Sequence, residues 1–230
     1  MLPLSGSEPI FSMHPWDTAV NSDNCYDYAI GDFERRRKVK STPGDRARMS
    51  ANTLNLKNCK GMAKRILADN PKTVYKCSNP NTVCKRGYYK IMNFIAPGED
   101  FHFYKQIQGV KYKVKAKDTI PLLAKFFRVT PTVIKTACKG VLVPGRTITF
   151  PVNLWTHKAG WGGPPLLTDS KGKTIRDPRS AARNYENGLL NYTKFCSAYC
   201  VKMNQAGSGF PSRVGLRLMR PSRGRQSQPL

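Results

Sequence analysis

The feature that most restricts the fold is a self-contained pattern in the middle of the chain, at residues 111–152. It opens with Tyr112 and Val114 alternating with lysines, as on a half-exposed strand. Apolar residues then recur with the i, i+3, i+4, i+7 spacing of one helical face, at Ile120, Leu123, Ala124 and Phe127. This segment therefore predicts a strand followed by a helix, with Asp118 and Thr119 available to cap it.

The same segment continues into a second helix and a closing strand. Thr130 and Pro131 have the residue types that favour a cap and a first helical position. The turn residues Pro144 and Gly145 then lead into Thr147-Ile-Thr-Phe150, which has strand composition. The pattern predicts a βααβ module within residues 110–152.

Residues 111–130 and 143–151 resemble a LysM repeat, whose sequence reads Tyr-x-Val-x-x-Gly-Asp-Thr-Leu and ends in Gly-x-x-Leu-x-Ile-Pro. LysM modules bind N-acetylglucosamine polymers, so the resemblance implies a wall polymer as partner. The implied glycan-binding loop is Ala116, Lys117, Asp118 and Thr119. Two positions depart from the family: Lys117 replaces the usual glycine, and Cys138-Lys139-Gly140 replaces the usual Asn-Pro. The alternative is a LysM fold kept only as a packing or docking unit.

The residues that flank the module predict that it is an insertion. Residues 101–106 and 153–158 both have strand composition and would form a hairpin if the module were removed. Insertion at a hairpin tip is well tolerated by folds. This pairing would bring His102 and His157 onto neighbouring strands.

Cys25 is the candidate nucleophile. It follows Asp23 and Asn24, either of which can cap a helix over 25–30. A helix N-terminus favours the thiolate, and a Cys–His pair needs a third polar group to orient the imidazole. The predicted catalytic residues are therefore Cys25 as nucleophile, His102 as base and His157 as orienting group. Alternatively, Cys25 is a buried structural cysteine and the histidines are structural.

The order of these elements resembles the NlpC-type and CHAP-type papain-like cysteine hydrolases. The resemblance implies an α+β fold, with a papain-like helix plus antiparallel sheet that carries the inserted βααβ LysM-like module. It also implies cleavage of amide bonds in peptidoglycan. The expected domains are an N-terminal arm at 1–22, a discontinuous papain-like domain at 23–109 and 153–203, the module at 110–152, and a basic C-terminal tail at 204–230.

Further elements are predicted outside the module and the candidate site. Residues 54–69 suggest a helix that ends at Asn70-Pro71, and residues 87–95 have strand composition. The seven cysteines fit up to three disulfides or seven reduced thiols. Cys196 and Cys200 would share a face if their segment were helical. The cysteine spacings are poor for zinc, so neither a metal nor a cofactor is expected.

The net charge of +25, from 39 basic and 14 acidic residues, favours polyanionic partners. Three functions stay open. The first is a wall-targeted cysteine amidase or peptidase. The second is a basic minor capsid or other virion protein of a large DNA virus, built on an inactive hydrolase scaffold and bound to acidic neighbouring subunits, and the third is a nucleic-acid binder, which only the charge supports. The first 16 residues lack the pattern of a signal peptide, and no apolar stretch is long enough for a membrane span. A virion or a cell-wall location is expected over the cytoplasm.

Overall fold

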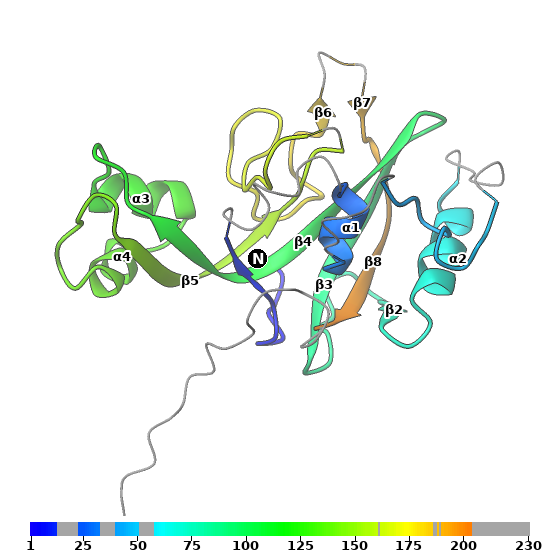
Figure 1. The fold of residues 1–230 in the computed structure, drawn as a ribbon, viewed down its shortest axis with the longest axis horizontal. Helices are drawn as coiled ribbons and strands as arrows, with labels where there is room; N and C mark the ends of the chain where they lie inside the picture. Colours follow the sequence, from blue (N-terminus) through cyan, green and yellow to red (C-terminus); the bar gives the residue numbers. More distant parts are fainter. Residues whose placement is uncertain are drawn as a thin grey trace, which may run out of the picture.

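The protein has a mixed α+β fold built on a mostly antiparallel sheet (Figure 1). The computed structural model describes residues 1–12, 23–32, 40–50, 58–160, 162–185, 188 and 190–203. Its helices are α1 (Cys25–Ile30), α2 (Cys59–Asp69), α3 (Ile120–Phe127) and α4 (Pro131–Ala137). Its strands are β1 (Ile10–Phe11), β2 (Val74–Lys76), β3 (Tyr88–Ala96), β4 (Asp100–Lys113), β5 (Thr147–Thr156), β6 (Asn184–Tyr185), β7 (Leu190–Asn191) and β8 (Lys194–Lys202).

The central sheet has the order β1-β4-β3-β8-β2, and β5 also pairs with β4. All of its pairings are antiparallel except that of β1 with β4, which is parallel. The expected N-terminal arm therefore contains a strand, and its residue Leu2 is buried in the core. The rest of that arm, residues 13–22, and the tail at 204–230 lie outside the described residues.

The predicted hairpin is confirmed as an antiparallel ladder between β4 and β5. The ladder runs from the pair Lys105 and Thr156 to the pair Lys113 and Thr147. The strand expected at 101–106 and the one expected around Tyr112 both lie in β4, which ends at Lys113, and a register shift between Ile107 and Gly109 separates them. The first and last strands of the βααβ module are the ends of β4 and β5, which pair from Val110 and Phe150 to Lys113 and Thr147. Backbone hydrogen bonds therefore fix the position of the module on the sheet.

The two faces of the sheet are covered by different elements (Figure 1). On one face, α1 and α2 pack with Phe101, Phe103 and Tyr199 in a single apolar cluster. On the other, the N-terminal residue Leu2 and the chain after β5, including Ile175 and Tyr192, cover residues such as Tyr104 and Trp155. Successive side chains of a strand point to opposite faces, so Phe101 and Phe103 of β4 contribute to the first cluster and Tyr104 to the second.

The core of the module is continuous with the rest of the protein, because its apolar cluster also includes Phe11, Ile107, Leu154 and Leu167. Thr119 caps α3 by accepting a hydrogen bond from Leu122 N, as the sequence predicts. Both helices have proline in the first turn, at Pro121 and Pro131. The buried residues include Val114, Leu123, Phe127, Ile134, Ile148 and Phe150.

The last strand differs from expectation. Residues 194–202 form β8, not a helix, and a register shift against β3 leaves Cys196 as an extra residue between Phe195 and Ser197. This bulge reverses the alternation, so Cys196 faces α2 while Cys200 faces the opposite side with Cys77.

Candidate functional site

Cys25 is the first residue of α1, as the sequence predicts. Asn24 caps the helix, accepting hydrogen bonds from Tyr26 N at 2.9 Å and Asp27 N at 3.1 Å, while Asp27 accepts from Asn24 N. This reciprocal arrangement is a capping box. The local sequence therefore accounts for where the helix begins and for the placement of the thiol in its first turn.

The environment of the Cys25 thiol opposes thiolate formation. Its sulfur is buried and lies 3.8 Å from the carbonyl oxygen of Phe101, against the apolar side of β4. Burial raises the pKa of this thiol, and the carboxylates of Asp100 and Asp27 raise it further. The predicted lowering of the pKa by the helix N-terminus is therefore wrong, because the cost of desolvating the thiolate is larger.

The two histidines meet as predicted, with His102 on β4 and His157 directly after the end of the neighbouring strand β5. His102 Nε2 lies 2.9 Å from His157 Nδ1, and His157 Nε2 lies 2.9 Å from the carbonyl oxygen of Thr168. A carbonyl only accepts, so His157 donates from Nε2 and accepts at Nδ1 from His102. Both side chains are buried, and burial lowers the pKa of each, that of His157 to about 4. The pair is thus a neutral hydrogen-bonded relay.

Tyrosines surround this relay. Tyr192 stacks on His102 with 4.9 Å between ring centroids, and Tyr104 and Tyr185 also contact it. The hydroxyl of Tyr192 donates to Asp100 at 2.8 Å. The histidines are therefore part of an aromatic cluster beneath the loop that follows β5.

The structure does not bring Cys25 together with the histidines. Cys25 packs with Phe101 and Phe103, whereas His102 contacts Tyr104 and His157 on the other face of β4. Adjacent residues of one strand point in opposite directions, so the sheet itself separates the sulfur from both rings. The predicted orientation of His102 toward Cys25 is wrong for this physical reason.

Two buried lysines occupy the face that Cys25 shares, and sequence reasoning missed both. Lys105 donates to the carbonyl oxygen of Tyr28 at 2.6 Å and lies 3.7 Å from the centre of that ring. Burial lowers the pKa of Lys105 to about 7 and that of Lys158 to about 8. Lys105 is two and four residues after Phe103 and Phe101, so the strand period places all three side chains on the face that packs on α1. This spacing was a signal in the sequence.

Three of the four residues of the predicted glycan-binding loop, Ala116, Lys117 and Thr119, are exposed, and Asp118 is half-buried. The Asp118 carboxylate accepts from Lys115 N at 2.6 Å and from the Tyr112 hydroxyl at 2.9 Å, and Thr119 caps α3. Asp118 and Thr119 therefore have structural roles in shaping the loop.

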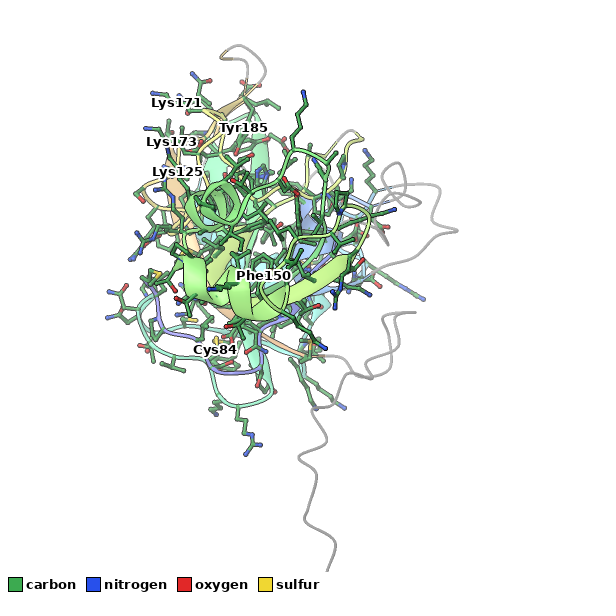
Figure 2. All side chains as sticks on the ribbon, turned by 90° about the vertical axis from the view of Figure 1, so that its left-hand side faces the viewer. Cys84, Lys125, Phe150, Lys171, Lys173 and Tyr185 are labelled. Carbon is green, nitrogen blue, oxygen red and sulfur yellow. A yellow bond between two sulfur atoms is a disulfide. The ribbon has the colours of Figure 1, made fainter. Side chains whose placement is uncertain are left out.

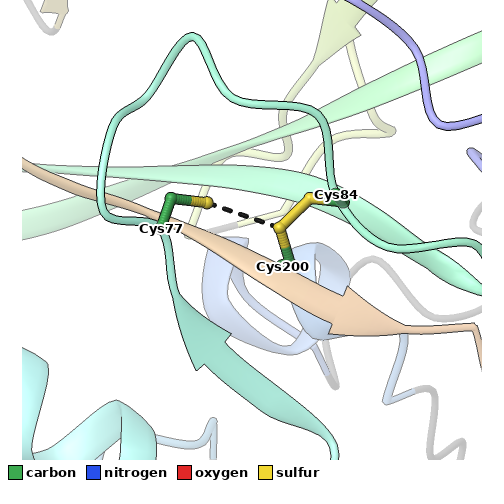
Figure 3. A group of neighbouring side chains, drawn as sticks. All are labelled: Cys77, Cys84 and Cys200. Atoms are coloured by element: carbon green, nitrogen blue, oxygen red, sulfur yellow. Dashed lines mark hydrogen bonds between the residues drawn. A yellow bond between two sulfur atoms is a disulfide. The ribbon is translucent and has the colours of Figure 1, made fainter.

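Four cysteines form two disulfides, Cys59–Cys196 and Cys84–Cys200, while Cys25, Cys77 and Cys138 are free. The expected upper limit of three disulfides is thus not reached. Cys77 lies against the second bridge, with its sulfur 3.4 Å from that of Cys200 (Figure 3). The spacings in the sequence gave no sign of this three-sulfur cluster, because Cys77 directly follows β2, Cys84 lies in a loop and Cys200 lies in β8.

Comparison with known proteins gives no relative: no family model, no curated protein and no solved structure matches the chain. In the described part of the chain, every helix is too short or too polar to cross a membrane.

Proposed function

We propose that the chain is a non-catalytic binding protein, a structural component of a larger assembly that docks on an acidic protein surface. The observation that carries this proposal is the separation of Cys25 from His102 and His157 by the sheet. A cysteine hydrolase needs its thiolate and imidazole within hydrogen-bond reach. A buried thiol of raised pKa on the opposite face supports a scaffold role for the same elements.

The candidate docking surface is the α3 face, defined as Leu122, Lys125 and Phe126 of α3 together with Lys171 and Lys173 of the adjacent loop. Leu122 is 52% exposed and Phe126 is 42% exposed, one helical turn apart. The Thr174 hydroxyl donates to the Phe126 carbonyl oxygen at 2.6 Å, which attaches the loop to α3. Figure 2 shows Lys125, Lys171 and Lys173 gathered on one side of the molecule.

The charge on this side is strongly positive. Residues 110–152 contain a single acidic residue, Asp118, whose carboxylate is engaged inside the module. In the loop, Asp169 accepts from the backbone N–H groups of Lys171 and Lys173. The basic side chains of the module are all exposed: Lys111, Lys113, Lys115, Lys117, Lys125, Arg128, Lys135, Lys139 and Arg146.

The mixture of apolar and basic residues favours a protein over a nucleic acid as the partner. Leu122 and Phe126 are large apolar side chains left in water, and Val141 and Val143 of the same module are also exposed. Interfaces with nucleic acid are polar and wet, whereas protein interfaces have apolar centres and polar rims. An acidic protein surface with apolar side chains complements the α3 face in both respects.

The proposal is compatible with the resemblance to LysM repeats and papain-like hydrolases, because a binding protein can keep such folds without the activity. The βααβ module serves as a docking unit, and the helix-on-sheet domain serves as a scaffold. Asp118 and Thr119 keep the shape of the loop, while Lys117 adds charge where the family has glycine. A minor capsid or other virion protein is one such component, and its acidic neighbouring subunits would be the partner.

The proposal is tested by binding an acidic amphipathic helical peptide of leucine and glutamate, with a DNA duplex in parallel. The leucines of the peptide are spaced i, i+3, i+4 and i+7, so that they form one helical face, and the glutamates form the other. We expect the peptide to bind with an affinity that falls with added salt, because opposite charges are screened. Both Leu122→Ser and Lys125→Gln should weaken binding about tenfold each, the effect of roughly 1.4 kcal/mol. The exposed Lys72, which lies before β2, provides the matched control Lys72→Gln, which should leave binding unchanged.

Two results would overturn the proposal. One is hydrolysis of peptidoglycan or of a model amide that is abolished by Cys25→Ala and by His102→Ala. The other is duplex binding that depends on Lys125 and not on Leu122, with no binding of the peptide. The first would restore the cell-wall amidase, and the second would favour the nucleic-acid binder.

A further inference from the structure

The three-sulfur cluster joins a free thiol to an existing disulfide. Cys84 and Cys200 are bonded, and the Cys77 sulfur lies 3.4 Å from the Cys200 sulfur (Figure 3). All three sulfurs lie within 4.8 Å of one another. A thiolate that contacts a disulfide is positioned for thiol–disulfide exchange, which proceeds by attack of sulfur on sulfur.

The backbone holds Cys77 at this place. Cys77 directly follows β2, which pairs with β8, and its N–H donates to the Ala198 carbonyl oxygen at 2.9 Å. Cys200 lies further along β8, opposite Lys90 of β3. Pairing of three strands therefore brings the two sulfurs together, and the contact does not depend on a loop conformation.

The positive charge of Lys90 acts on the Cys77 thiol. The Lys90 side chain is buried, and its ammonium donates to the Pro80 carbonyl oxygen at 2.7 Å. Partial burial raises the pKa of the Cys77 thiol, and the positive charge of Lys90 opposes that rise. The charge of Lys90 reduces the rise without reversing it, so exchange at this site depends on the 3.4 Å contact between the Cys77 and Cys200 sulfurs.

We propose that Cys77, Cys84 and Cys200 form a thiol–disulfide exchange site that moves the bridge between two positions. The Cys77 thiolate attacks the Cys200 sulfur, a Cys77–Cys200 bond forms and the Cys84–Cys200 bond breaks. Cys84 leaves as a thiolate and takes up the proton that Cys77 lost. One disulfide is exchanged for another, so the step needs no oxidant or reductant.

The exchange changes which part of the chain is attached to β8. In the Cys84 form, the bridge ties the exposed segment 78–83 down at its far end. In the Cys77 form, the bridge ties β2 directly to β8 and leaves Cys84 as a thiol between the exposed residues Val83 and Lys85. The freed thiol is then available to a disulfide of a neighbouring protein, which is the chemical class of substrate that this site fits. This inference is independent of the proposed docking function.

The experiment is time-resolved alkylation of the full wild-type chain without reductant, followed by acid quenching and disulfide mapping of the unreduced digest. We expect two labelled species: label on Cys77 with Cys84–Cys200 intact, and label on Cys84 with a Cys77–Cys200 bridge. Label confined to Cys77 until that residue is fully modified would overturn the proposal. The Cys59–Cys196 peptide serves as an internal control for the folded state.

Variants sharpen the result. Cys77→Ser should cause complete loss of label at Cys84, because nothing remains to displace it. After oxidation in air, with dioxygen as the two-electron oxidant, Cys84→Ser should form the Cys77–Cys200 bridge, and the control Cys138→Ser should retain both labelled species. If Cys77 and Cys200 were both alkylated in Cys84→Ser while Cys59–Cys196 stayed bonded, the proposal would also fail.

Discussion

The two faces of the central sheet carry the same kinds of residue that a cysteine hydrolase uses, but they divide them. The face under α1 holds Cys25 among aromatic side chains and two buried lysines. The opposite face holds the His102–His157 relay among tyrosines. The difference teaches that catalytic residue types on adjacent elements form a site only when their side chains point to the same face of the sheet.

The largest effect is expected from opening the α1 face. Phe103 is fully buried and contacts Tyr26 with 5.2 Å between ring centroids. Phe103→Ala should lower the free energy of unfolding by about 3–5 kcal/mol, because it leaves a cavity under α1. Chemical denaturation measures the loss. A change below about 1 kcal/mol would mean that α1 is not packed on β4 as described.

The disulfide on the same face should come next. Cys59–Cys196 joins α2 to β8 and closes a span of 137 residues. Cys59→Ser should cost about 2–5 kcal/mol without reductant, since the bridge restricts the unfolded chain. Unfolding in the presence of a strong reductant should give the same stability for both proteins. A persistent difference under reduction would assign the effect to packing.

The histidine face should respond to acid between pH 6.5 and 4, below the pH range in which Lys105 and Lys158 of the α1 face titrate. Burial places the pKa of folded His157 at about 4, below the ordinary 6.5, so the unfolded state binds the proton first as the pH falls. The stabilising contribution is complete above pH 6.5 and is lost between pH 6.5 and 4, by up to about 3 kcal/mol.

Replacing the imidazole tests this assignment. His157→Gln should lower stability at pH 7 but flatten the dependence between pH 6.5 and 4 relative to the wild type. Denaturation midpoints at several pH values measure both. An unchanged slope in the variant would mean that other groups cause the acid sensitivity.

The smallest effect is expected in the module. Asp118 accepts the Tyr112 hydroxyl and the Lys115 N–H, and burial together with this carboxylate raises the pKa of Tyr112 to about 12. Asp118→Asn should cost roughly 1 kcal/mol and lower the tyrosine pKa. Ultraviolet titration follows the phenolate. Lys117→Gln is the matched control in the same loop and should change neither quantity.

Local patterns predicted the fold well. The βααβ module, the hairpin that brings His102 to His157, and the helix that begins at Cys25 all follow from periodicity, capping residues and strand alternation. These signals are short-range, so a single sequence carries them. The alternation of β4 also explains why Cys25 does not meet His102. Helix α1 packs on the apolar face of the strand, which carries Phe101 and Phe103, and His102 points to the other face.

Other parts depend on contacts that no local pattern reports. The disulfide partners lie more than a hundred residues apart. The bulge at Cys196 reverses the parity of β8 and so sends two cysteines to different faces. The burial of Lys105 and Lys158 also contradicts the usual exposure of lysine.

The most direct measurement is the alkylation rate of Cys25 in the folded protein, compared with that of the partly exposed Cys77. The account predicts that Cys25 is modified only through unfolding, with a rate that denaturant raises and that His102→Ala leaves unchanged. Rapid modification of Cys25 near neutral pH, lost in His102→Ala, would show a thiolate paired with an imidazole and would contradict the separation of the two faces.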